Sequence, residues 1–286
     1  VSHGALSARA GLRGQLTWDF MSAVTPSAMG GAPFAGFFIA ILVALWLIKG
    51  ARLQINPAAI RDCNVAESSK AILSVAGPAA FSNAINPIGL SVLTALLASQ
   101  GEAAVAGFGA AGRLQSFAVV PLLALSGSIG AIVGQNWGAG HADRARRAMW
   151  WSGLFCVGYG LAIAVVLFFT GDWFADIFTD DPAVIEEFSR YLAISVWGYA
   201  GFGLLIVANG ALNAVDKAGL ALAQSAARVF LVMLPFGWVL RSAWGSSAIY
   251  AAELVANLAG GALAAFIVWR VLRAGPDRGR EAQTNT

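Results

Sequence analysis

The chain has 286 residues, of which 58% are hydrophobic and 12% are charged, and its formal net charge at pH 7 is +3. Ordinary soluble domains carry about 25% charged residues, so this composition, with a mean hydropathy of +0.70, excludes a soluble protein and indicates an integral membrane protein. The basic residues lie between apolar segments, which argues against a nucleic-acid partner.

Seven apolar segments approach or exceed the roughly 20 residues that a membrane-spanning helix needs. We therefore predict an all-α, polytopic membrane protein. No signal-peptide pattern precedes the first segment and the chain starts at Val1, so we expect a piece of a longer polypeptide. In chain order the segments cover residues 27–49, 71–98, 106–135, 148–170, 189–213, 218–240 and 247–273.

Polar side chains stand at membrane depth in the second and third segments. Ser82, Asn83 and Asn86 share one helical face beside a proline. Polar groups there are costly unless they are paired or hydrated, so these side chains either line a cavity or hydrogen-bond to neighbouring helices. Arg113, close to Gln115, is predicted to extend toward the outer membrane surface.

Three prolines inside the spans are hinge candidates, because proline removes a backbone hydrogen bond and bends a helix. They are Pro78, Pro87 and Pro121, and Pro235 falls inside a later span. At each of these positions the alternative is a fixed kink that does not move.

Two connections carry helix-boundary signals. Three glycines between Gly134 and Gly140, followed by a basic turn, predict a helix end at the membrane surface. Asp180-Asp181-Pro182 predicts a helix start, since an acid and a proline both favour a helix N-terminus. We expect the whole stretch from Gly171 to Phe188 to be a connection outside the membrane.

The last three spans contain the remaining polar groups. Asn209 and Asn213 share a face and are predicted to join helices by hydrogen bonds. Glu253 and Asn257 share a face of the last span, and Arg228 stands in the span before it. A buried arginine needs a partner, so we predict that Arg228 pairs with Glu253, either as a structural pair or in gating or coupling.

Lysine and arginine separate into two sets of alternate connections. One set carries twelve of them, and the other carries only Arg190 and Arg241. Short cytoplasmic loops retain positive charge, so the first set and the C-terminus are predicted to be cytoplasmic. The twelve are Lys49, Arg52, Arg61, Lys70, Arg144, Arg146, Arg147, Lys217, Arg270, Arg273, Arg278 and Arg280.

The spans lack the side-chain sets that catalysis needs. No span combines Ser, His and Asp or opposes two acids, and both histidines lie in connections. Cys63 and Cys156 differ in environment, so neither a disulfide nor a metal site is predicted. A transporter is therefore favoured over an enzyme.

A series of motifs runs through the middle of the chain. It comprises Gly77-Pro78, Gly101-Glu102-Ala103-Ala104-Val105-Ala106-Gly107-Phe108, Arg113-Leu114-Gln115-Ser116-Phe117, Gly134-Gln135-Asn136-Trp137-Gly138-Ala139-Gly140 and Asn209-Gly210-Ala211-Leu212-Asn213-Ala214 with Lys217. The series resembles the seventh and eighth helices, and the link between the tenth and eleventh, of the multidrug and toxic compound extrusion (MATE) family. The resemblance covers about residues 30–273.

Members of that family consist of two six-helix bundles that face each other across a cleft. The resemblance implies that the chain holds the six-helix C-terminal bundle of a twelve-helix transporter, with about one helix of the N-terminal bundle. The implied parts are the end of the N-terminal bundle at 1–52, a cytoplasmic linker at 53–70, the C-terminal bundle at 71–273 and a cytoplasmic tail at 274–286.

The resemblance also implies a function. Family members export organic, often cationic, compounds by alternating access in exchange for protons or sodium ions, so we expect no other cofactor. We expect an inner (plasma) membrane location, and the bilayer, a small organic substrate and the rest of the N-terminal bundle as partners. The cleft candidates are Asn83, Asn86, Asn209, Arg228, Glu253 and Asn257.

Two residues are candidates for the coupling ion. Members that bind the ion in the C-terminal bundle carry an acid where this chain has Asn86, so the candidates are Glu253 and, in the N-terminal part, Asp19. One alternative is a lipid or lipid-linked-sugar flippase of the same superfamily. An alternative of another class is a polytopic membrane enzyme.

Overall fold

A computed structural model of the chain describes Leu42 and residues 65–275. The segment 65–275 contains helices and short connections, without strands. The elements are α4 (Val65–Ala98), α5 (Glu102–Gly138), α6 (Ala142–Phe178), α7 (Pro182–Ser195), η1 (Val196–Gly198), α8 (Tyr199–Ala214), α9 (Ala218–Ala226), η2 (Ala227–Met233), α10 (Leu234–Trp244) and α11 (Ser246–Ala274).

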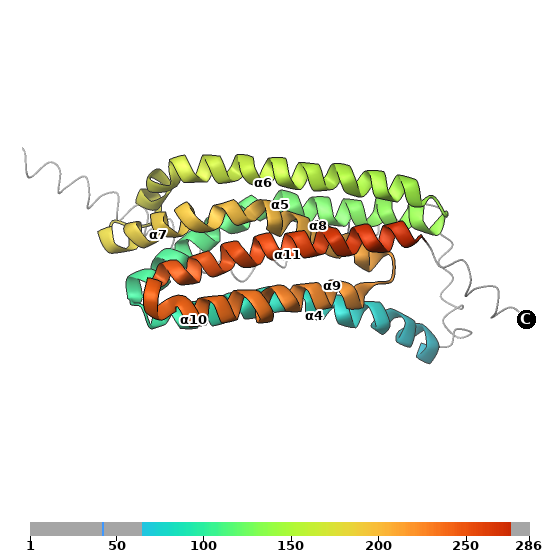
Figure 1. The fold of residues 1–286 in the computed structure, drawn as a ribbon, viewed down its shortest axis with the longest axis horizontal. Coiled ribbons are helices and arrows are strands. Elements are labelled where there is room, and N and C mark those ends of the chain that lie inside the picture. The colour runs from blue at the N-terminus through green and yellow to red at the C-terminus, as the bar shows by residue number, and fades with distance from the viewer. Residues whose placement is uncertain (1–41, 43–64, 276–286) are drawn as a thin grey trace, which may run out of the picture. The chain divides into compact units, whose positions relative to one another are not determined.

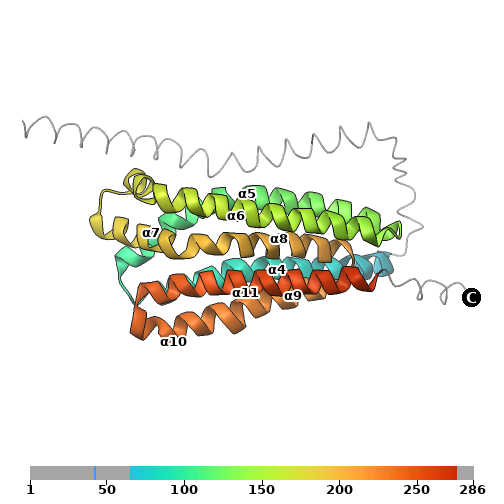
Figure 2. The same cartoon turned by 45° about the horizontal axis from the view of Figure 1, so that its top comes forward.

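These elements form six membrane-length spans, which confirms the six spans predicted within 71–273. The fourth span joins α7, η1 and α8, and the fifth joins α9, η2 and α10. Figures 1 and 2 show the spans lying side by side, with their connections gathered at the two ends of the bundle. The predicted first span at 27–49 lies outside the described residues, as does Asp19.

The predicted helix boundaries are confirmed at two connections. Asp181 caps α7, because its carboxylate accepts a hydrogen bond of 2.9 Å from the Ala183 amide, and Pro182 occupies the first turn. α5 ends within the glycine-rich stretch, where Gly140 has a φ of +75° that favours glycine. Both ends therefore arise from local sequence.

The connection predicted from Gly171 to Phe188 is mostly helical in the structure. α6 continues to Phe178 and α7 starts at Pro182, which leaves three residues between them. Asp172 and Asp176 are exposed on the last turns of α6, so their charges remain at the surface of the bundle without ending the helix. The Ser189 hydroxyl also donates a hydrogen bond of 2.6 Å to Asp172.

The span that contains α8 lies at the centre of the bundle. In this span, 72% of an 18-residue apolar stretch is buried inside the bundle, whereas the corresponding share in the other spans is 22–44%. Glycines let the backbones of neighbouring helices approach this span closely. Small residues are expected at such contacts because helices in a membrane associate by close packing, without a hydrophobic driving force between them. A Cβ atom on Gly261 of α11 would lie 2.4 Å from the Gly201 carbonyl oxygen of α8, and one on Gly160 of α6 would lie 2.5 Å from the Ala200 Cα.

The two ends of the bundle differ in charge, as the loop counts predicted. The end where α11 finishes carries Arg144, Arg146, Arg147, Lys217, Arg270 and Arg273. The opposite end carries the acids of the α6–α7 connection together with Arg190 and Arg241. The described bundle thus carries its basic residues mainly at one end.

Candidate functional site

A cavity of about 650 Å³ opens among α4, α5, α8, α9, η2 and α11. Its size lies within the range of small-molecule sites. Apolar side chains form most of its wall, and the polar groups are few and placed on facing helices. These polar groups, which define what we call the polar cavity, are Ser82, Asn83, Asn86, Thr94, Gln115, Ser116, Asn209, Ser225, Arg228 and Glu253.

Glu253 of α11 is buried, with 3% of its surface exposed. The Gln115 side chain of α5 donates a hydrogen bond of 2.8 Å to its Oε1, and the Tyr191 hydroxyl of α7 donates one of 2.9 Å to its Oε2. Three separate spans thus bring one carboxyl group and two neutral hydrogen-bonding groups together, and of these residues Glu253 and Gln115 line the cavity.

Packed rings fix the position of the Tyr191 hydroxyl. The Tyr191 ring meets Phe108 edge-on at a centroid distance of 5.4 Å and meets Tyr250 edge-on at 5.3 Å. Edge-to-face pairs of this kind add to the stabilisation that burial provides. The hydrogen-bonding geometry at Glu253 is therefore set by packing in the half of the bundle that contains α7.

The predicted pair of Arg228 and Glu253 is wrong. No ion pair joins them, and the Arg228 guanidinium instead donates hydrogen bonds to the side-chain oxygens of Asn86 and Asn257. It also lies 5.1 Å from the centroid of the Phe202 ring, a cation–π distance. Amide oxygens and an aromatic face satisfy the planar guanidinium without a bonded acid. Arg228 and Glu253 act on each other only electrostatically, across the cavity that both line.

A π-helical segment places Arg228 at the cavity. Residues 227–233 form η2, a wider turn inserted between α9 and α10. Such segments are rare and recur at functional sites. Pro235 is the second residue of α10, directly after η2 ends at Met233 and α10 begins at Leu234. It lacks the N–H that an α-helix would direct toward the Leu231 carbonyl. Pro235 was the sequence signal for an irregular helix here, but it did not predict a π-helix.

A second polar cluster joins α4, α8 and α9. The hydroxyl groups of Ser82 and Ser225 are 2.9 Å apart, and the Asn209 amide donates a bond of 3.1 Å to Ser225. The Gln224 amide donates a bond of 2.6 Å to the Asn209 oxygen. The prediction that these asparagines join helices by hydrogen bonds is confirmed for Asn209, which also lines the cavity. It is not confirmed for Asn213, whose buried side-chain oxygen has no hydrogen-bond partner among the described residues.

The structure brings five of the six cleft candidates to the cavity. Asn257 is the exception: its side-chain oxygen accepts a hydrogen bond from Arg228, but Asn257 does not line the cavity. Among the hinge candidates only Pro87 lines the cavity; Pro78 and Pro121 lie elsewhere in α4 and α5. Whether any of them moves stays a prediction.

Two site residues were not predicted from the sequence. Tyr191 and Gln115 are both buried and both hydrogen-bond to Glu253. The sequence signal for Gln115 is a neutral polar side chain inside an apolar span, two residues after Arg113. Arg113 itself is exposed and does not line the cavity. Within residues 65–275, no three His, Cys, Asp or Glu side chains converge as a metal site would require.

The Asn257 hydrogen bond to Arg228 gives a stability prediction. Asn257→Ala removes an acceptor from a buried cation, and hydrogen bonds to charged groups contribute about 1.5–3 kcal/mol. We expect a loss of that size in the free energy of unfolding, measured by denaturant unfolding in detergent. Asn83→Ala is the matched control, because Asn83 is an exposed asparagine of the cavity wall. Equal stability of both variants would contradict the assigned role of Asn257.

The six apolar spans with a polar cavity at membrane depth define a multi-pass membrane protein with a transporter-type architecture. The family model MatE matches residues 78–239, and the chain belongs to this family of transporters. This confirms the family inferred from the motifs.

Similar proteins support the same assignment. The chain is 36% identical over 161 residues to an FAD transporter of Shewanella oneidensis, a match that covers 56% of this chain and 36% of that protein. It is 26% identical over 148 residues to the probable multidrug resistance protein NorM of Thermotoga maritima, covering 51% and 32% respectively. The chain thus spans about a third of the length of these relatives.

The fold also matches solved transporter structures. The bent form of the Vibrio cholerae MATE transporter VcmN superposes with a TM-score of 0.76 at 28% identity, covering 82% of this chain and 54% of that one. A MOP superfamily transporter from Pyrococcus furiosus gives a TM-score of 0.76 at 15% identity, which shows a shared fold.

Proposed function

We propose that the chain forms the C-terminal bundle of a cation-coupled antiporter that exports organic compounds by alternating access. The polar cavity would be half of the substrate cleft, completed by an N-terminal bundle of the same polypeptide. The proposed location is the inner (plasma) membrane, with the C-terminus in the cytoplasm, on the basis of the charge asymmetry between the two ends.

The observation that carries this proposal is the buried position of the Glu253 carboxyl group and the neutral character of its hydrogen-bond partners. Its carboxyl group is buried at the cavity wall, and its described hydrogen-bond partners, Gln115 and Tyr191, are neutral. The carboxylate lies at membrane depth without a directly bonded cation, and Arg228 acts on it only from a distance. Such a group gains stability from binding a cation. A proton or a sodium ion should therefore bind Glu253 more tightly in the access state in which water does not reach the carboxyl group. Coupling requires such a difference in ion affinity between the two access states.

The substrate class follows from the other charged group of the wall. Arg228 places a cation beside Phe202 and the polar side chains of α4. A buried guanidinium with a nearby ring suits a planar organic anion. We therefore propose, as a second candidate beside cationic compounds, an anionic aromatic substrate such as a flavin nucleotide; the S. oneidensis relative is named an FAD transporter.

A flippase for lipids or lipid-linked sugars is less well supported. Such a cleft would need several cations for phosphate groups, and in the described segment Arg113 does not face the cavity. Arg228 is then the single guanidinium of this wall. The antiporter accounts for the placement of both Glu253 and Arg228.

Transport by the full-length protein in proteoliposomes tests the proposal. We expect export of FAD or of a cationic dye when a pH gradient or a sodium gradient is imposed alone, and no export when neither gradient is present. Preference for FAD over the dye would support the anionic substrate class. Export that proceeds equally without either gradient would contradict ion coupling, and the absence of any export under all conditions would contradict the antiporter.

A further inference from the structure

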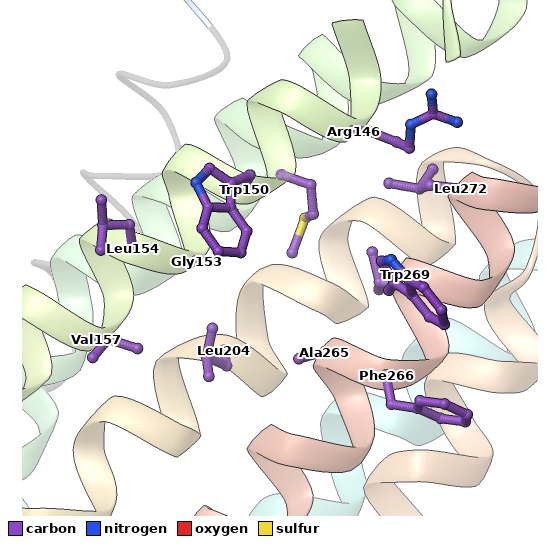
Figure 3. Close-up of a pocket in the computed structure, with 12 residues that line it drawn as sticks. Arg146, Trp150, Gly153, Leu154, Val157, Leu204, Ala265, Phe266, Trp269 and Leu272 are labelled. Carbon is purple, nitrogen blue, oxygen red and sulfur yellow. The ribbon is translucent and has the colours of Figure 1, made fainter. Parts of the chain in front are cut away.

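A separate groove lies between α6 and α11, with α8 as its floor (Figure 3). Its volume is about 540 Å³, and it shares no lining residue with the polar cavity. Leu204 of α8 forms part of the floor, while Trp150 of α6 and Trp269 of α11 stand on opposite walls. The groove is therefore a second concave site, distinct from the proposed substrate cleft.

The groove wall is apolar and reaches the outside of the bundle. Trp150, Leu154, Phe266 and Trp269 each expose at least half of their surface. In a membrane-spanning bundle an exposed apolar groove of this kind offers a binding surface for lipid acyl chains. Arg146 is the charged residue of the wall, and Figure 3 shows it at one end of the groove, beside Leu272.

The charges at that end favour an anion. The Arg270 guanidinium lies 6.0 Å from the centroid of the Phe266 ring, and the Arg273 guanidinium lies 5.1 Å from that of Trp269. Both arginines are thus held against the aromatic residues of the wall. Asp143 pairs with Arg146, so the three guanidinium groups outnumber this one carboxylate.

We propose that this groove binds an anionic phospholipid, with its acyl chains against the tryptophans and its phosphate group near Arg146, Arg270 and Arg273. Tryptophan and arginine together mark the level of the membrane–water interface. Basic pockets between spans recognise anionic head groups, and each arginine near such a surface contributes about 1 kcal/mol. The arginines at this end of the bundle favour an anionic head group. The apolar groove favours a lipid over a free phosphate, because only a lipid has acyl chains to fill it.

Native mass spectrometry of the full-length protein with added lipid tests this inference. We expect retention of phosphatidylglycerol over phosphatidylcholine of matched chain length. Arg146→Gln should weaken phosphatidylglycerol binding about fivefold, the equivalent of the contribution of one interfacial arginine. Arg147→Gln is the matched control, because it removes the same charge from a neighbouring exposed residue that does not line the groove.

A second pair of variants tests the apolar part. A Cβ atom on Gly153 would contact Leu204 Cδ2 at 3.5 Å, whereas one on Gly158 meets no atom within 4 Å. Gly153→Leu should therefore fill the groove and reduce lipid retention, and Gly158→Leu on the same helix should leave it unchanged. Equal retention of both lipids, or unchanged binding in Arg146→Gln and Gly153→Leu, would overturn the proposal. Retention of neither lipid by the wild-type protein, as when another part of the chain fills the groove, would overturn it as well.

Discussion

Glu253→Gln is expected to abolish gradient-driven export while leaving a folded, inserted protein. The glutamine side chain has nearly the same shape as glutamate and still accepts the hydrogen bond that Gln115 donates. It cannot bind or release a proton, and it offers a weaker site for sodium than a carboxylate. Export measured in proteoliposomes should fall to the level of protein-free vesicles, with unchanged elution on gel filtration.

The control is Glu186→Gln, the same substitution at an exposed acid that pairs with Arg190. Exposed ion pairs contribute at most about 1 kcal/mol, so this variant should export like the wild-type protein. If Glu253→Gln lost folded protein in proportion to export, Glu253 would be a structural residue and ion coupling would lie elsewhere.

Gly261→Ala is expected to have the largest effect on stability. The added Cβ would lie 2.4 Å from the Gly201 carbonyl oxygen and 2.5 Å from its Cα, and both atoms belong to the backbone of α8. No side-chain rotation relieves this contact, so α8 and α11 must separate. We expect a loss of at least about 3 kcal/mol in the free energy of unfolding, the upper range for overpacking, measured by denaturant unfolding in detergent.

Gly158→Ala provides the comparison, because a Cβ atom there meets no neighbour and the residue lies inside α6. Alanine is preferred over glycine within a helix by about 1 kcal/mol. This variant should be as stable as the wild-type protein or slightly more stable. A Gly261→Ala variant of wild-type stability would mean that α8 and α11 do not touch at Gly201.

The length of the apolar segments was enough to predict the six spans. A membrane-spanning helix needs about 20 apolar residues whatever helices surround it. Local chemistry also predicted the Asp181 cap and the helix end near Gly140. The extent of α6 was mispredicted because Asp172 and Asp176 were read as loop residues, although an exposed helical face accepts such charges.

The site was predicted less well, since it depends on contacts between distant segments. Gln115, Tyr191 and Glu253 come from three spans and meet through packing that no local pattern reveals. Arg228 was assigned to the available acid by charge alone. Its actual partners are amide oxygens on α4 and α11, and its position depends on η2.

The central claim is that the polar cavity is the route taken by the substrate. Asn83 lines the cavity and is exposed, so Asn83→Cys, in a full-length protein whose other cysteines are replaced, reports access to it. The measurement is labelling by a membrane-impermeant maleimide from each side of the membrane under opposite gradients of protons or sodium. We predict that labelling occurs from both sides and that reversing the gradient shifts the balance between them. Labelling from one side only, unaffected by any gradient, would contradict alternating access at this cavity.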